Sequence, residues 1–116
     1  MGMKLKSSIT TRKRRSRSAL LPLITPGEML AEEFMQPLGL ASNALALALR
    51  VRATRIQAIV KSQRAITADT ALRLGRYFGN SAEFWLNLQQ QYDLDLVRRE
   101  RLAEIEAQVA ERVPAG

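Results

Sequence analysis

Residues 40–64 have the sequence LASNALALALRVRATRIQAIVKSQR, and this stretch decides the fold. It contains two short helical patterns, Ser42 to Leu49 and Ala53 to Lys61, which are separated by only a few residues. The second pattern has an apolar stripe on one side and Thr, Gln, Lys and Arg on the other. Such a pair is typical of a helix-turn-helix, whose second helix must both pack on a core and lie in a DNA groove.

The composition favours one all-helical domain. The chain has 116 residues, 47% of them hydrophobic, and this length allows one modest core but not two. Six residues are aromatic and six are glycine, whereas Ala, Leu and Arg are abundant. The sequence has neither Cys nor His, which removes a thiolate metal site, the commonest general base and the commonest metal ligand. We therefore expect no enzymatic activity, no catalytic residue, no metal and no cofactor.

Positive charge is concentrated in two segments. Residues 1–20 carry seven Lys or Arg and no acid, and residues 41–76 carry seven basic residues against Asp69 alone. Residues 21–40 and 77–97 are each net acidic by three charges. Ordinary solvated charge, the alternative interpretation, would not predict this segregation, so we expect a polyanion as the partner.

Residues 1–24 are predicted to form a basic flexible N-terminal arm, because they are polar, basic and without helical periodicity. Two interpretations stay open for this arm: a disordered tail, or an arm that follows a DNA groove. The apolar run SALLPLI is interrupted by Pro22 and lacks a cleavage site, so a signal peptide is not expected. The apolar run at 38–49 is shorter than the roughly 20 residues that cross a bilayer. We therefore expect a cytoplasmic protein without a membrane partner.

Helix boundaries follow from caps and breakers. Residues 25–28, TPGE, form a capping box with Pro at the first helical position, and Pro37 ends that helix. Thr67 and Gly79 bound a helix at about 68–78, and Gly75 within it predicts a close helix contact. The inner face of that helix is predicted to be Ala71, Leu72, Gly75 and Phe78. Two more helices are predicted, at about 82–91 with Phe84, Trp85 and Leu88 in the core, and at about 95–112 with Leu102, Ile105 and Val109 on one side.

The order of these elements resembles the HigA family of antitoxins, which are Cro/repressor-type helix-turn-helix proteins of type II toxin–antitoxin modules. The resemblance covers about residues 25–99 and is carried by PGEMLAEEFMQPLGL and ITADTALRLGRYFGNSAEFWLNLQ. It implies an all-α fold, a compact five-helix Cro/repressor-like helix-turn-helix domain with an additional C-terminal helix. The expected division is an arm over 1–24, a DNA-binding domain over 25–92, and a C-terminal helix over 93–116 that contacts a second copy or a toxin.

The function that the resemblance implies is that of an antitoxin. Such a protein is a homodimer that binds double-stranded operator DNA, neutralises a cognate ribonuclease toxin and represses their shared operon. A dimer predicts an operator that is an inverted repeat, with half-site centres roughly 10 bp apart. The alternative is a free-standing helix-turn-helix transcription regulator without a toxin partner. An RNA-binding or ribonuclease function fits the charge, but the chain has no His and few aromatic residues for base stacking.

The predicted DNA-contacting residues come from helical periodicity and from the resemblance. Periodicity places Thr54, Gln57 and Lys61 on the outer side of the second helix and Arg55 on its flank. The family's other contact positions correspond to Ser42 and Asn43 at the start of the first helix and to Arg64 after the second. Gln57 is suited to adenine, and Arg55 to either guanine or phosphate, whereas Ser42, Arg52 and Arg64 are expected to contact the DNA backbone.

The turn and caps of the motif depart from the family pattern. Ala41 and Ser42 stand where the family has Ser and Gln, so the cap of the first helix is expected at Ser42. Arg50 replaces the Gly of the turn, which costs roughly 1–2 kcal/mol if the backbone there is left-handed. Arg52 replaces the Ser that caps the second helix, and Leu47 is expected to be exposed. We therefore expect DNA binding with more electrostatic attraction and less sequence discrimination.

Overall fold

The structure, a computed structural model, describes residues 22–113, which form five helices and no strand. They are α1 (Pro26–Met29) with its π-helical continuation η2 (Leu30–Met35), α2 (Ser42–Leu49), α3 (Ala53–Val60), α4 (Ala68–Phe78) and α5 (Ala82–Gln108). The all-α prediction is confirmed. The arm predicted over 1–24 lies outside the described residues, except for its last three.

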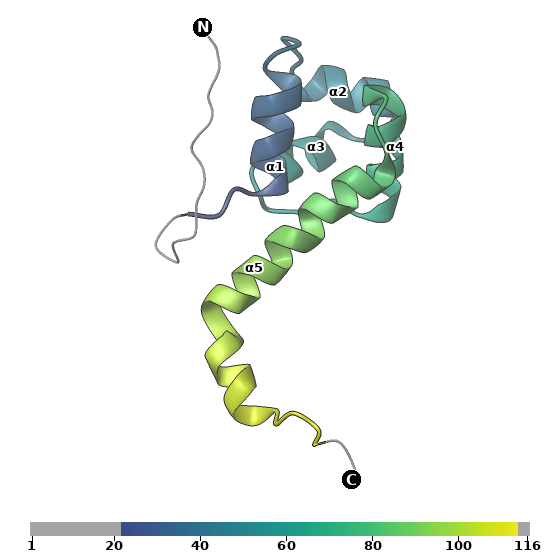
Figure 1. Cartoon of the computed structure of the whole chain (residues 1–116). Coiled ribbons are helices and arrows are strands. Elements are labelled where there is room, and N and C mark those ends of the chain that lie inside the picture. The colour runs from purple at the N-terminus through teal and green to yellow at the C-terminus, as the bar shows by residue number, and fades with distance from the viewer. Residues whose placement is uncertain (1–21, 114–116) are drawn as a thin grey trace, which may run out of the picture.

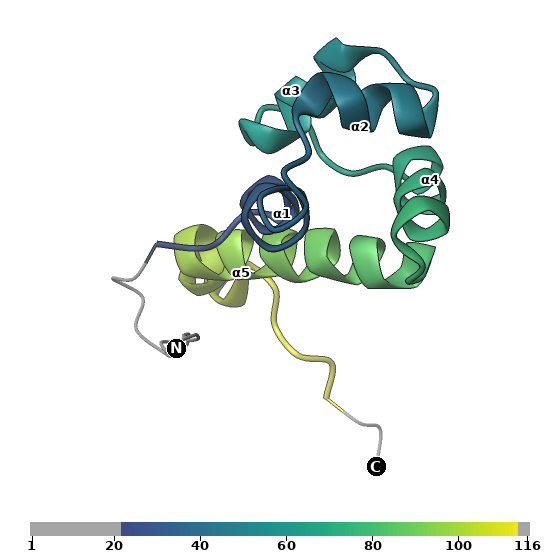
Figure 2. The same ribbon diagram turned by 90° about the horizontal axis from the view of Figure 1, so that it is seen from above.

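Helix α1, with η2, contacts both α3 and α5 (Figure 1). Figure 2 shows α2 and α3 on one side of it and α5 on the other, with α4 joining the two sides. Every helix contributes to the core, whose buried side chains are Leu30, Met35, Leu45, Ala46, Leu49, Ile56, Ile59, Ile66, Ala71, Leu74 and Trp85. The position of the helix-turn-helix is therefore set by the rest of the domain.

A cluster of aromatic rings joins η2, α4 and α5. The ring centroid of Trp85 lies 4.7 Å from that of Phe34 and 6.0 Å from that of Phe78. Trp85 is fully buried, and its indole N–H donates to Asn80 Oδ1 at 2.9 Å, so no polar atom of the side chain is left unpaired. Phe84, which was predicted in the core, is 37% exposed and packs only at the edge of this cluster.

The start of α1 is fixed by the predicted capping box. Thr25 Oγ1 accepts from the amide of Glu28 at 3.0 Å, and Glu28 Oε1 accepts from the amide of Thr25 at 2.9 Å. Gly27 packs directly against the last turn of α3, because a Cβ atom at this position would lie 1.8 Å from the carbonyl oxygen of Ile59. Only glycine permits this approach, by which α1 supports α3.

In α4 the close contact predicted at Gly75 is confirmed, since a Cβ there would lie 2.8 Å from the backbone of Ser81 and Ala82. The prediction of the inner face of α4 is wrong at one position. Leu72 is 65% exposed, whereas Leu74 is fully buried. The reason is helical geometry: Leu74 stands three residues after Ala71 and shares its face, but Leu72 is turned by about 100°.

The two C-terminal helices predicted from the sequence are one helix, α5. The predicted break is bridged by side-chain hydrogen bonds one turn apart, from Gln89 to Asp93 and from Gln91 to Asp95, each 3.0 Å long. No Gly or Pro interrupts residues 82–113. The helix ends before Val109, and its C-terminal half projects away from the domain (Figure 1).

Candidate nucleic-acid interface

The turn between α2 and α3 adopts the strained conformation that its sequence predicts. Arg50 has φ 62° and ψ 44°, in the left-handed region. The amide of Val51 donates to the carbonyl of Ala46 and the amide of Arg50 to that of Leu47, so the helix ends in a Schellman motif. Glycine is the usual residue at the position of Arg50, because a Cβ atom there meets the neighbouring backbone.

We expect Arg50→Gly to raise the free energy of unfolding by about 1 kcal/mol, since it relieves this strain. The measurement is urea unfolding followed by circular dichroism. Arg50→Ala is the matched control, because it removes the same side chain and charge but keeps a Cβ atom in the left-handed backbone. If alanine stabilises the protein as much as glycine does, the effect comes from charge and not from backbone strain.

Neither helix of the motif has a side-chain cap at its N-terminus. Ala41 is the N-cap of α2, and Arg52 is the N-cap of α3, and neither side chain accepts a hydrogen bond from the first turn. The cap predicted at Ser42 is therefore wrong, because Ser42 is already the first residue of the helix. The prediction that Arg52 does not cap α3 with its side chain is confirmed.

The outer face of α3 is polar and its inner face is in the core. Ile56 and Ile59 are buried, while Thr54, Gln57 and Lys61, spaced by three and four residues, are exposed on the other side. Lys61 directly follows the last residue of α3. The remaining predicted residues also lie in or beside the motif: Asn43, Arg52 and Arg64 are exposed, and Ser42 is half-buried.

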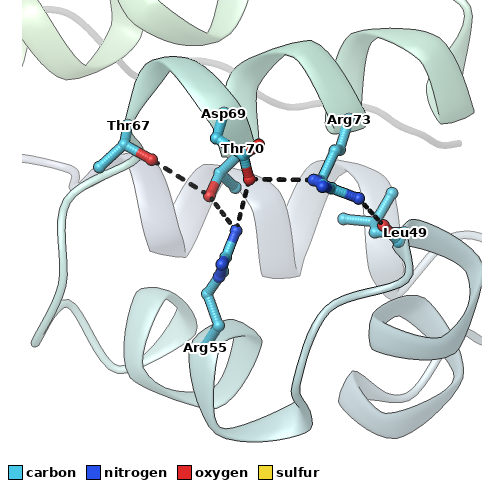
Figure 3. Close-up of polar contacts among 6 residues, drawn as sticks. All are labelled: Leu49, Arg55, Thr67, Asp69, Thr70 and Arg73. Atoms are coloured by element: carbon cyan, nitrogen blue, oxygen red, sulfur yellow. Dashed lines mark hydrogen bonds and ion pairs between the residues drawn. The ribbon is translucent and has the colours of Figure 1, made fainter.

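Arg55 differs from these residues because its guanidinium contacts the protein itself (Figure 3). Its Nη1 atom lies 2.7 Å from Asp69 Oδ2 and 3.4 Å from Thr70 Oγ1. Arg73 Nε donates to the same Asp69 oxygen at 2.9 Å, and Arg73 Nη1 donates to the carbonyl oxygen of Leu49 at 2.9 Å. These four bonds connect the end of α2, the first turn of α3 and the first turns of α4.

The two guanidinium groups lower the pKa of Asp69, Arg73 through its hydrogen bond most and Arg55 next. A lowered pKa means that this pairing stabilises the fold at pH values above the ordinary carboxyl pKa of about 3.9, and that the contribution is lost as the pH falls through the lower pKa of the folded state. This network was not predicted from the sequence. The available signals were that Asp69 is the only acid in 41–76 and that Arg73 follows it by one helical turn.

The loop that carries Arg64 is held at both ends. Near its start, the hydroxyl groups of Thr25 and Ser62 share a hydrogen bond. Near its other end, the amide of Ile66 donates to Gln89 Oε1 of α5 at 2.8 Å. The loop is thus anchored on α1 and α5, which restricts the positions from which the exposed Arg64 can reach a ligand.

Comparison with known proteins identifies the family. No model of a protein family matches the chain. Virulence-associated protein I of Dichelobacter nodosus is 54% identical over 81 residues, 70% of this chain and 75% of that protein. Antitoxin HigA-1 of Vibrio cholerae is 39% identical over 71 residues, 61% of this chain and 67% of that protein. The antitoxin HigA of Pseudomonas aeruginosa, solved with the higBA promoter, is 43% identical with a TM-score of 0.75, over 78% of this chain and 98% of that one.

The chain belongs to the HigA family of antitoxins. The resemblance inferred from the sequence is therefore confirmed, and with it the Cro/repressor-like helix-turn-helix fold. Within residues 22–113 this HigA-family chain has no helix that combines the length and apolar character needed to cross a membrane.

Proposed function

We propose that this HigA-family chain is an antitoxin that binds and neutralises a cognate ribonuclease toxin and represses its own operon by binding operator DNA. The observation that carries the proposal is the two-sided α3, which buries Ile56 and Ile59 and presents Thr54, Gln57 and Lys61 outward. A related HigA was solved with its promoter, which supports DNA as the ligand of this face. The chain acts as a regulator and not as an enzyme, in the cytoplasm where bacterial operators lie.

We assign roles to the exposed residues by their reach and chemistry. Thr54, Gln57 and Lys61 enter the major groove, where Gln57 hydrogen-bonds a base edge. Ser42, Asn43, Arg52 and Arg64 contact phosphates at the border of the groove and position the motif. Arg55 can reach DNA only by giving up or sharing its ion pair with Asp69, whose Oδ2 atom is 2.7 Å away.

A homodimer is the proposed functional unit, and the C-terminal half of α5 is the proposed contact surface. Leu94, Val97, Leu102 and Ile105 lie within less than half of the circumference of this helix, and the first three are exposed. This half of α5 projects from the domain (Figure 1). A second copy would cover the apolar stripe and place two copies of α3 on one operator.

Introducing Asp at both Leu94 and Val97 should shift the protein from dimer to monomer in sedimentation experiments, because two buried carboxylates would oppose association. Ala103→Asp is the control, since it places the same charge on the opposite side of α5 and should leave the dimer intact. A dimer that survives the double change while toxin binding is lost would assign the stripe to the toxin.

Co-expression with each open reading frame flanking the gene tests the antitoxin proposal. We expect one small basic partner to co-purify, and the complex to protect an inverted repeat in its own promoter from cleavage. Promoter binding without any protein partner would favour the free-standing regulator. A protein that binds neither a neighbour nor its promoter would refute both functions.

A further inference from the structure

Asp69 occupies an unusual position in the charge distribution of the motif. It is the only acid among residues 41–76, which carry seven basic side chains. Two of these, Arg55 and Arg73, bind the same carboxylate oxygen (Figure 3). The other five basic residues of this fully described segment form no ion pair, namely Arg50, Arg52, Lys61, Arg64 and Arg76.

We propose that Asp69 is a positioning residue that raises sequence discrimination, because it holds Arg55 against α4 and keeps that guanidinium off DNA phosphates. The proposal rests on the DNA-binding function proposed above. Arg55 directly follows the exposed Thr54 in the first turn of α3. Released from Asp69, its long side chain would be free to neutralise any phosphate within reach, and a phosphate contact carries no sequence information.

The network also contacts both helices of the motif. Arg73 links Asp69 to the carbonyl oxygen of Leu49, the last residue of α2, while Arg55 links it to the first turn of α3. The carboxylate therefore joins α3 to α4 through Arg55, and it also holds Arg73, the α4 residue that bonds the end of α2. Neither N-cap of the motif has a side-chain hydrogen bond, so these tertiary contacts take over part of the positioning that caps normally provide.

The two expected consequences of losing this carboxylate differ in size. The side chain of Asp69 is 56% exposed, and ion pairs in water contribute little to stability. A released guanidinium that finds a phosphate, by contrast, steepens the dependence of log K on log salt by about 0.9 and raises affinity severalfold near 0.1 M salt. The main effect should therefore appear in DNA binding and not in folding.

The central test is Asp69→Asn, measured as binding to the operator and to a random duplex of equal length over a series of salt concentrations. We expect affinity for the random duplex to rise about threefold to eightfold near 0.1 M salt, with a salt slope steeper by about 0.9. Affinity for the operator should rise less, so the ratio of operator affinity to random-duplex affinity falls. An unchanged slope and an unchanged ratio would overturn the proposal.

Two further variants separate release of Arg55 from a general charge effect. In an Arg55→Met background, Asp69→Asn should raise affinity for the random duplex by less than half as much as it does in the wild type. This is the result that a double-mutant cycle gives for two interacting residues. A gain that persists in full would show that Asp69 acts only as a distant negative charge. Glu83→Gln is the control for charge alone, because it removes an exposed carboxylate from the first turn of α5 and should leave DNA binding unchanged.

Arg55→Met alone gives an independent result that does not need the Asp69 variant to fold. If Asp69 withholds Arg55 from DNA, the salt slope of this variant should equal that of the wild type. A slope that becomes shallower by about 0.9 would show that Arg55 contacts phosphate in the wild type, and would refute the proposal. Failure of the wild type to bind either duplex would instead refute the proposed DNA-binding function.

Discussion

Replacing Trp85 with alanine should lower the free energy of unfolding by about 3–5 kcal/mol. The side chain is fully buried, and its ring packs against Phe34 and Phe78, which belong to η2 and α4. Removing it leaves a cavity at the point where three elements meet. Because native domains are stable by only about 5–15 kcal/mol, most of the stability of this small domain would be lost.

Urea unfolding followed by far-UV circular dichroism measures this effect, since Trp85 is the only Trp and its fluorescence disappears with the substitution. Trp85→Phe is the control. It keeps an aromatic ring but loses the second ring of the indole and the hydrogen bond to Asn80, whose side chain is exposed and can bind water instead. We expect Trp85→Phe to lower the free energy of unfolding by less than half as much as Trp85→Ala. A loss below about 1 kcal/mol for Trp85→Ala would contradict the assignment of this residue as the centre of the core.

Local signals in the sequence predicted most of the helices. The capping box at Thr25, the breaker Pro37 and the glycine at the end of α4 mark boundaries that the structure reproduces. Periodicity also identified the buried face of α3, because Ile56 and Ile59 repeat at the helical spacing. These features depend on neighbouring residues only, which is why they could be found without the fold.

Three features that the sequence did not reveal depend on contacts beyond the apolar pattern. The break predicted in α5 failed because hydrogen bonds from Gln89 and Gln91 extend the helix across a stretch without a strong apolar pattern. The tight packing of Gly27 on Ile59 depends on two segments 32 positions apart, and no local pattern marks it. The Asp69 network joins three helices, so the sequence could place Arg55 on a flank but could not identify its partner.

These long-range contacts explain how a motif with poor local signals keeps its shape. Its turn places Arg50 in the left-handed region, and both of its helices lack side-chain caps. Each feature costs stability locally. The motif is supported from outside by α1 through Gly27 and by α4 through Asp69 and Arg73. Its position for DNA binding is thus a property of the whole domain.

Gln57→Ala should lower affinity for the operator by about 1–3 kcal/mol, the usual effect of losing one direct base contact, while affinity for random DNA stays nearly constant. The side chain is exposed on the outer face of α3. Alanine has the higher helix propensity, so the substitution should not unfold the helix. Gln90→Ala removes an exposed Gln from α5 and serves as the control, with no expected effect on DNA binding.

Arg64→Ala should weaken binding to both duplexes, whereas Gln57→Ala should weaken binding to the operator alone. If this arginine contacts phosphate, its loss weakens binding to operator and random DNA by a similar factor and makes the salt slope shallower by about 0.9.

Equal losses of affinity on both duplexes for Gln57→Ala would show that Gln57 makes no base-specific contact. In that case the five basic residues of 41–76 that form no ion pair supply most of the binding energy. The ratio of operator affinity to random-DNA affinity should then be far smaller than in proteins that read base edges.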